Sequence, residues 1–512
     1  MARIADAVRP RLERATAAAR LRVTRTGRPQ AVRTWQYTAG AATVGLALAA
    51  GVVTAAGPWD STGQRTAERE RAAAQERTGG ADHGRTSDSS GSFDAAAGAP
   101  RPAPSAPAVL AGLGGASASA PPAPGTPPLD RLLGPLLNDP ALGERHTAVV
   151  VDLTTGRRLY GSGGDVALTP ASTTKIATAV AALSALGPDH RLTTRAVLEP
   201  DTRELILVGG GDPTLTARAD DGGWASLRTL AAATAAALKK RGLTDVTLSY
   251  DTSLYAGPVL HPIGENENLA PVTPLMVDEA RTDDSTSGTA TRAEDPAADA
   301  VRRFADLLHA QGVRTGSPGP SKATQRAQTL ATVSSPPLSD LVERMLTDSD
   351  NDIAEHLARQ TALATGTRPD FPGAGEAIHR QLAKLGLPLK GAVFKDGSGL
   401  DRTDRITADL LTALLTRAAD PARPGLRPVL TGLPVAGFTG TLTTRYADGA
   451  AGIVRAKTGT LTGVNTLAGT AVAPQGHLLA FAFLTSGTSD SAAAQRALDR
   501  AATALAGPAT PN

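Results

Sequence analysis

The chain has no cysteine, which excludes disulfide-stapled folds, thiol chemistry and zinc sites built on cysteine. Its eight histidines show no HExxH or comparable ligand spacing, so the sequence gives no positive case for a metal or any other cofactor. The net charge of only +3 over 512 residues gives no indication of nucleic-acid binding.

Lysine is also scarce, because the chain has eight lysines against forty-four arginines. Arginine does not release its proton near neutral pH, whereas a desolvated lysine can act as a base. The few positions that retain lysine are therefore candidates for chemistry that needs an amine.

The N-terminal region has the composition of a targeting segment followed by a linker. Residues 1–36 hold nine arginines and two acidic residues, whereas residues 37–57 carry no charge and reach the roughly twenty residues that cross a bilayer. The positive-inside rule predicts a basic cytoplasmic segment over 1–36 and export of the rest. Residues 37–57 are expected to be a transmembrane anchor, or a signal h-region cleaved near Ala55; a buried Ala-rich helix is the remaining interpretation.

Residues 58–127 are dominated by Ala, Gly, Pro, Ser and Thr. Such a segment cannot bury enough apolar surface to offset its ordering entropy, so it is predicted to be a disordered tether. Folding signals begin only after it.

Helical and strand patterns alternate from residue 129 onward, which predicts an α+β class with an antiparallel sheet and helices against it. Helical patterns cover 129–137, 173–186, 227–240, 338–361, 377–385, 408–418 and the segment from 492, and strand patterns cover 147–151, 158–160, 204–208, 246–250, 453–458 and 477–484. The mixed region 193–325 is interpreted as an insertion, so one catalytic domain is predicted from 128–192 and 326–508.

The first motif is Ser172-Thr-Thr-Lys175, which leads directly into a helical pattern. Residues i and i+3 share a helix face, so the Lys175 amine can reach the Ser172 hydroxyl and take its proton. A first-turn backbone N–H at Ser172 would also be free to bind an oxyanion. The simpler interpretation is a Ser-Thr helix start with an exposed lysine, although no other Ser-x-x-Lys occurs in the chain.

The second motif is Ser349-Asp350-Asn351, at the start of a helical stretch. Ser349 could relay a proton to a leaving amine, and the Asn351 amide could bind a substrate backbone group. An N-cap cluster is the plainer interpretation.

The third motif is Lys457-Thr458-Gly459-Thr460, on a predicted strand. Lys457 and Thr458 can fix a free carboxylate, Gly459 allows close approach of a peptide, and the Thr460 N–H can complete an oxyanion hole. Alone, this is an ordinary strand end. Each of the three patterns occurs once, however, and they stand in the order used by known acyl-transfer families, which makes coincidence a poor explanation.

These motifs resemble those of the active-site-serine penicillin-recognising enzymes. The 177-residue separation of Ser172 from Ser349 is similar to that of the class C low-molecular-mass penicillin-binding proteins, which carry domains inserted there. Further stretches that resemble this family are Gly209 to Leu215, Asp396-Gly-Ser-Gly-Leu400, Leu433 to Gly437, Gly440 to Leu442, and Arg445.

The resemblance implies a penicillin-binding/β-lactamase-like transpeptidase domain that acts as a D-Ala-D-Ala carboxypeptidase/endopeptidase on peptidoglycan peptides in the cell envelope. It implies that the penultimate D-Ala carbonyl acylates Ser172, that water releases the product, and that β-lactams acylate the same serine. Two alternatives remain: a β-lactamase, for which no deacylating Glu segment can be assigned, and a non-catalytic peptidoglycan-binding or β-lactam-sensing module.

Overall fold

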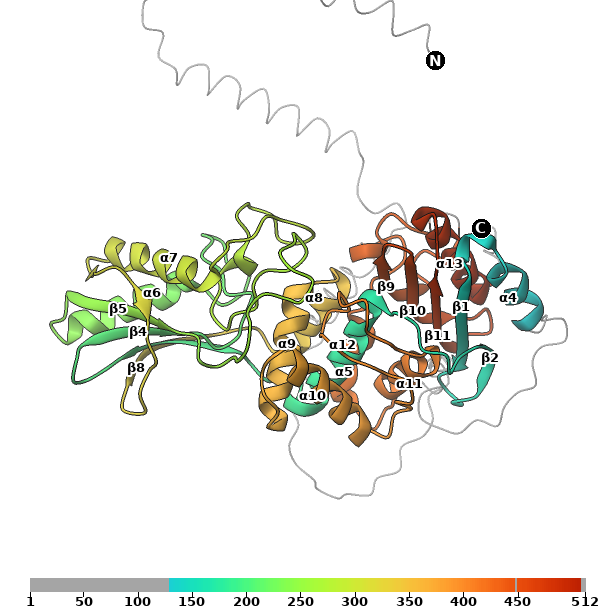
Figure 1. Ribbon diagram of the computed structural model, residues 1–512, viewed down its shortest axis with the longest axis horizontal. Coiled ribbons are helices and arrows are strands. Elements are labelled where there is room, and N and C mark those ends of the chain that lie inside the picture. The colour runs from blue at the N-terminus through green and yellow to red at the C-terminus, as the bar shows by residue number, and fades with distance from the viewer. Residues whose placement is uncertain (1–128, 447–448, 508–512) are drawn as a thin grey trace, which may run out of the picture. The chain divides into compact units, whose positions relative to one another are not determined.

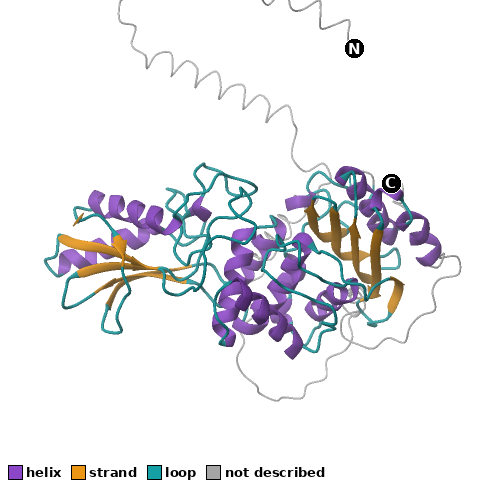
Figure 2. Ribbon diagram, in the orientation of Figure 1, coloured by secondary structure: helices purple, strands orange, loops and turns teal. Residues whose placement is uncertain are grey.

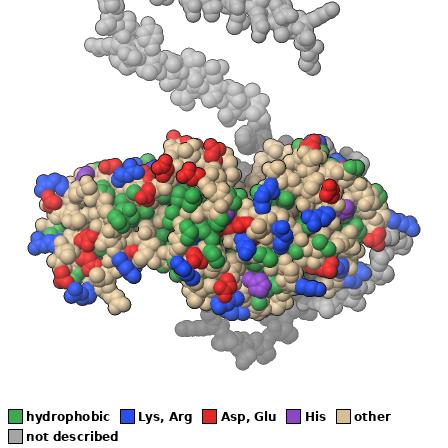
Figure 3. Space-filling view, viewed as in Figure 1, with side chains coloured by type: hydrophobic (Ala, Val, Ile, Leu, Met, Phe, Trp, Pro, Cys, Tyr) green, Lys and Arg blue, Asp and Glu red, His purple; other side chains and the backbone are tan. Residues whose placement is uncertain are grey.

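The computed structural model describes residues 129–446 and 449–507, which form two sheets and the helices around them. The predicted basic segment 1–36, the anchor or signal segment 37–57 and the tether 58–127 all lie outside the described residues. Within the described ranges, no helix is both long and apolar enough to span a membrane. Acidic and basic side chains are interspersed on the face shown in Figure 3.

The first sheet is antiparallel throughout and has the strand order β2-β1-β11-β10-β9. Its strands are β1 (Arg145–Asp152), β2 (Arg158–Ser162), β9 (Val454–Leu461), β10 (Val464–Val472) and β11 (Leu478–Ser486). Figure 1 shows that the first and last parts of the described chain meet here, because β1 lies beside β11.

Both faces of this sheet are buried, and β11 shows why. Successive strand residues point to opposite faces. Phe481 and Phe483 therefore join the core beneath the helices α4 (Leu129–Leu137) and α13 (Ser491–Ala506), whereas Ala482 and Leu484 join the core on the other side.

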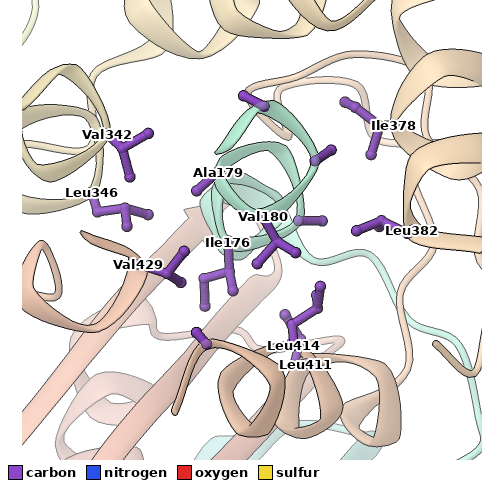
Figure 4. Packing of buried hydrophobic residues seen from close by; sticks show 14 of the residues in the cluster. Ile176, Ala179, Val180, Val342, Leu346, Ile378, Leu382, Leu411, Leu414 and Val429 are labelled. Atoms are coloured by element: carbon purple, nitrogen blue, oxygen red, sulfur yellow. The ribbon is translucent and has the colours of Figure 1, made fainter. Parts of the chain in front are cut away.

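The helix α5 (Thr174–Leu186) runs through the centre of that second core. Its side chains are mostly small, so neighbouring helices can pack closely on every side of it. Figure 4 shows Ile176, Ala179 and Val180 of α5 among apolar side chains of its neighbours. These neighbours are α8 (Leu338–Thr347), α9 (Asn351–Thr365), α10 (Phe371–Lys384), α11 (Ala408–Ala419) and α12 (Pro428–Thr431).

The second sheet belongs to the inserted unit and is mixed, since β3 pairs antiparallel with β4 and β8 whereas β4 pairs parallel with β5. Its main strands are β3 (Thr193–Leu198), β4 (Glu204–Val208), β5 (Asp245–Asp251) and β8 (Gln328–Ser334). Two helices, α6 (Leu227–Lys240) and α7 (Pro296–Ala310), pack against it around a separate hydrophobic core (Figure 2).

The structure differs from the sequence prediction in several places, and the strand β3 is one that was not predicted. The second sheet extends to β8, past the predicted boundary at residue 325, because β8 pairs with β3. The helical pattern over 338–361 is broken into α8 and α9 at Ser349, whose φ of 61° is incompatible with a continuous helix. Finally, β10 lies between the two strands predicted to close the chain.

Candidate active site

Ser172 lies on a single 3₁₀ turn, η3 (Ala171–Thr173), immediately before α5. Two hydroxyls anchor this turn: Thr173 Oγ1 donates to the carbonyl of Pro170 at 2.7 Å, and Thr466 Oγ1 of β10 donates to the same carbonyl at 2.8 Å. Ala171 has a φ of 49°, which redirects the chain just before the serine. The serine is therefore fixed between the helical core and the first sheet.

Lys175 follows one turn later, with its side chain fully buried. Its Nζ atom lies 3.0 Å from Ser172 Oγ, 2.6 Å from Asn351 Oδ1 and 2.8 Å from the carbonyl oxygen of Ser398. Burial lowers the pKa of Lys175 to about 8, although the nearby carboxylates of Asp396 and Glu355 act in the opposite direction. Lys175 thus lies within hydrogen-bond distance of Ser172, as the Ser-x-x-Lys spacing predicted, and is not an exposed lysine.

The second motif contains a helix N-cap, Asp350, and a side chain that contacts the lysine amine, Asn351. Asp350 is the N-cap of α9, accepting a hydrogen bond from the Ile353 amide at 2.9 Å. Asn351 accepts from Lys175 through Oδ1 and donates through Nδ2 to the carbonyl of Asn268 at 2.9 Å. Ser349 lies in a left-handed conformation just before the cap.

The third motif lies on the edge strand β9, which passes directly against the serine turn. A Cβ atom at Gly459 would lie 2.7 Å from the Pro170 carbonyl oxygen and 2.1 Å from Thr466 Oγ1, so only glycine fits there. Lys457 is fully buried, and its Nζ donates to the Thr458 carbonyl at 2.9 Å. Burial lowers the pKa of Lys457 well below its usual value, and the positive charge of Lys175 adds to this effect.

A cavity of about 300 Å³ opens over Ser172. The residues lining it are Ser172, Ser349, Thr441, Arg445, Thr458, Thr460 and Gln495. Ser172, Ser349, Thr458 and Thr460 are therefore brought together around this cavity, whereas Lys457 is fully buried and lies outside its lining.

Three residues of the lining, Thr441, Arg445 and Gln495, lie outside the three motifs, and Thr441 Oγ1 accepts a hydrogen bond from Thr458 Oγ1 at 3.0 Å. Nε2 of Gln495, on α13, lies 3.4 Å from Thr460 Oγ1 and donates to it. Arg445, noted above only as part of a family-like stretch, donates to both carboxylate oxygens of Asp499, with an Nε–Oδ2 distance of 2.9 Å. Nothing in the spacing around Gln495 could have indicated it, because α13 reads as an ordinary Ala-rich helix.

Within the described ranges, two groups of buried side chains come close enough to share a cation: His261, Glu355 and Asp396, and Glu279, Asp350 and Asp352. In both groups the carboxylates already have protein partners. Glu355 and Asp396 accept hydrogen bonds from backbone amides of the loop 397–401. Glu279 pairs with Arg281 and Arg344, and Asp352 with Arg292.

The fold and this cluster of side chains together define a class of protein. A serine on a 3₁₀ turn immediately before a core helix, a buried lysine three residues later and a β-strand edge facing them form the arrangement of active-site-serine acyl-transfer enzymes.

Comparison with known proteins narrows this class to a family. The family model for "D-Ala-D-Ala carboxypeptidase 3 (S13)" matches residues 129–288 and 280–505. The chain belongs to this family.

Curated relatives match over most of their length. The chain is 35% identical over 399 residues to carboxypeptidase Rv3627c of Mycobacterium tuberculosis, covering 75% of this chain and 85% of the relative. It is 31% identical over 440 residues to the D-alanyl-D-alanine carboxypeptidase of Actinomadura sp., covering 69% and 80%.

The fold is shared with penicillin-binding protein 4 of Haemophilus influenzae, with a TM-score of 0.60, 22% identity, and coverage of 73% of this chain and 98% of that one. That protein is also known in complex with a β-lactam, in a structure that matches with a TM-score of 0.56. The predicted α+β class with a penicillin-binding type of domain is thereby confirmed.

Proposed function

We propose that this protein is a serine-type D-alanyl-D-alanine carboxypeptidase/endopeptidase that acts on peptidoglycan stem peptides through an acyl-enzyme on Ser172. Membership of the S13 family and the two named carboxypeptidase relatives support the reaction class. The observation that carries the assignment of residues is the position of the Lys175 amine among Ser172, Asn351 and Ser398.

Those three partners decide which way the proton moves. The Asn351 side-chain oxygen and the Ser398 carbonyl can only accept hydrogen bonds, so they take the two N–H groups of a neutral Lys175 amine. The nitrogen lone pair then faces Ser172, the one partner whose O–H can donate. Lys175 thus serves as the base that removes the serine proton, and its lowered pKa makes the neutral amine available near pH 8.

The reaction follows in two steps. Ser172 Oγ attacks the carbonyl carbon of the penultimate D-Ala, its proton passes to Lys175, and the C–N bond breaks as the leaving amine of the terminal D-Ala takes a proton through Ser349. Water then attacks the ester and releases the shortened peptide. The backbone N–H groups of Ser172 and Thr460 stabilise the oxyanion in both steps.

The terminal carboxylate of the substrate is bound at the far side of the cavity. Thr458 and Thr460 line it and offer hydroxyls, and Arg445 adds positive charge that Asp499 partly neutralises. Lys457 contributes from beneath, through its hydrogen bond to the Thr458 carbonyl. Asn351, placed against Lys175, holds a backbone group of the peptide as well as the base.

β-Lactams act as covalent inhibitors, because their carbonyl and carboxylate mimic the substrate and acylate Ser172. The catalytic domain comprises residues 128–192 and the chain that follows the inserted sheet, up to residue 508. It works outside the cytoplasm, where peptidoglycan is found. The segment 37–57 attaches it to the membrane, or directs its secretion if it is cleaved near Ala55.

The test is release of D-alanine from a peptide ending in D-Ala-D-Ala by the full-length protein. We expect release by the unmodified protein and none by Ser172→Ala. A peptide with an amidated C-terminus is the matched substrate, and it should react more slowly because the carboxylate contacts are lost. D-alanine release by Ser172→Ala at an undiminished rate would overturn the assignment, and a cross-linked dimeric peptide measures the endopeptidase activity in parallel.

A further inference from the structure

His261 of the inserted unit is buried beside the active site, with only 3% of its surface exposed. Its Nε2 atom lies 3.1 Å from Oδ2 of Asp396, and its Nδ1 atom accepts a hydrogen bond from the Ile263 amide at 3.2 Å. Because Nδ1 is the acceptor, the ring proton is on Nε2 and is donated to Asp396. The inserted unit thus donates a hydrogen bond to the loop that begins at Asp396.

That loop holds the catalytic-site amine in place. Asp396 accepts hydrogen bonds from the amides of Gly399 at 2.6 Å and Asp401 at 2.7 Å, and Glu355 accepts from the amide of Ser398 at 2.8 Å. The carbonyl of Ser398 in turn accepts from Lys175 Nζ at 2.8 Å. The position of this carbonyl therefore depends on two buried carboxylates, one of which is bound by His261.

The segment that carries His261 is fixed on the helix α9. Arg359 donates to the carbonyl of Ala256 at 2.9 Å, and Asp352 accepts from the amide of Ala270 at the same distance. The His261 ring packs edge-on against Phe371, with 4.9 Å between ring centroids. The helix that presents Asn351 to Lys175 therefore also fixes the loop that presents His261 to Asp396.

We propose that His261 is a positioning residue for Lys175: through Asp396 it fixes the Ser398 carbonyl against the amine and offsets the Asp396 charge. The inserted unit, whose role the sequence left open, thereby takes part in setting the strength of the base. This inference rests on the proposed function of Lys175.

The charges around Lys175 give the direction of the effect. Burial lowers its pKa, whereas the carboxylates of Asp396, Glu355, Asp350 and Asp352 act in the opposite sense, in that order. Lys457 is the positive group that faces it from β9. The remaining neighbours of Asp396 are Asp404 and Asp401. The pKa of Asp404 is raised to about 10 by burial and by the charge of Asp396. Loss of the His261 donor leaves the Asp396 charge less compensated, so the ammonium form of Lys175 gains stability.

The Asn and Gln variants of His261 distinguish its contact with Asp396 from its contact with the Ile263 amide. His261→Asn retains an acceptor for the Ile263 amide but is too short to reach Asp396. His261→Gln places an amide N–H near the former position of Nε2. His261→Phe, which keeps the ring packing on Phe371, is a second variant without the donor. His356→Phe removes a different buried imidazole, which lies on α9, and serves as the control.

The measurement is the rate of acylation of the full-length protein by benzylpenicillin as a function of pH, with thermal unfolding of each variant. We expect His261→Asn and His261→Phe to move the acid limb of the profile upward by about one pH unit, which lowers the rate at pH 7 about tenfold. His261→Gln should restore the profile of the unmodified protein, and His356→Phe should lower the thermal stability without moving the limb.

An unmoved acid limb in His261→Asn and His261→Phe would overturn the inference, and so would equal rate losses in the Asn and Gln variants without a shift. These results leave the proposed function intact, because the unmodified protein still acylates. Absence of any adduct on the unmodified protein would overturn the proposed function together with the inference.

Discussion

Lys175 Nζ and Asn351 Oδ1 lie 2.6 Å apart, although the two residues are 176 positions apart in the chain. This hydrogen bond joins the first turn of α5 to the first turn of α9 and aligns the lysine amine on Ser172. In the proposed mechanism, the protonation state of this buried amine is the main control on the reaction.

The rate of acylation should therefore follow the neutral fraction of Lys175. Its pKa is lowered to about 8, mainly by burial, so the rate should rise with pH through about 8 and level off above it. Stopped-flow acylation with a chromogenic cephalosporin measures this profile. Lys175→Arg keeps the charge but cannot release its proton, and it should show only residual acylation; a rate independent of pH between 6 and 9 would be inconsistent with a lysine base.

Ser349 lines the cavity and has a φ of 61°. Both Ser349→Ala and Ser349→Gly remove the hydroxyl, and D-alanine release should fall about 100-fold in each. The left-handed backbone suits glycine, so Ser349→Gly should be more stable than Ser349→Ala by about 1 kcal/mol. Denaturant unfolding measures the stability difference between the two variants. A large difference in activity between them would show that the backbone conformation, and not the hydroxyl, controls turnover.

Gly459 allows β9 to pass against the serine turn. The added methyl group of Gly459→Ala would meet Thr466 Oγ1 and the Pro170 carbonyl oxygen well inside normal contact distance. We expect a loss of about 1–3 kcal/mol in stability and slower acylation, because the turn that carries Ser172 must shift. Gly459→Ala with unchanged acylation would show that the turn is not held by this contact.

His356 gives the fold a pH-dependent stability contribution of known sign. Burial lowers its pKa to about 3, and its Nδ1 atom lies 3.0 Å from the Gly211 carbonyl oxygen. Below pH 6.5 the unfolded chain binds a proton that the folded protein excludes, so stability is lost as the pH falls from there towards 3. The stability difference between the unmodified protein and His356→Phe should narrow by about 2 kcal/mol between pH 7.5 and pH 5.

Denaturant unfolding at the two pH values measures this difference. The comparison isolates His356, because the buried carboxyl groups, such as Glu355, are common to both proteins. His379→Phe, a substitution at an exposed position, is the control and should show no such narrowing. A stability difference between the unmodified protein and His356→Phe that does not change with pH would contradict a buried, neutral His356.

The sequence predicted most of the helices and strands that carry the candidate site residues. A motif such as Ser172 to Lys175 is local, so the helix period alone places the serine and the lysine on one face. The strand β10 was missed because both of its faces are buried and its polar residues, such as Asn465 and Thr466, satisfy their hydrogen bonds inside the protein. Its sequence therefore lacks the alternation that marks a half-exposed strand.

The supporting residues could not be predicted because their roles arise only from the tertiary fold. Glu355 resembles any helical glutamate until the loop 396–401 packs against it, and the hydrogen bond between His261 and Asp396 spans 135 positions of sequence. The predicted boundary at residue 325 does not include β8 because this strand is largely exposed and has no continuous apolar run. Sequence patterns report local periodicity, whereas these contacts depend on topology.

The most direct test of the account is intact-mass analysis of the full-length protein after incubation with benzylpenicillin, followed by peptide mapping. We expect one stable adduct per chain, located on Ser172, absent in Ser172→Ala and formed at least about 100-fold more slowly in Lys175→Ala. An adduct on another residue, or its formation at an unchanged rate in Lys175→Ala, would contradict the proposed nucleophile and base. Rapid turnover of the antibiotic without an adduct would instead indicate a β-lactamase.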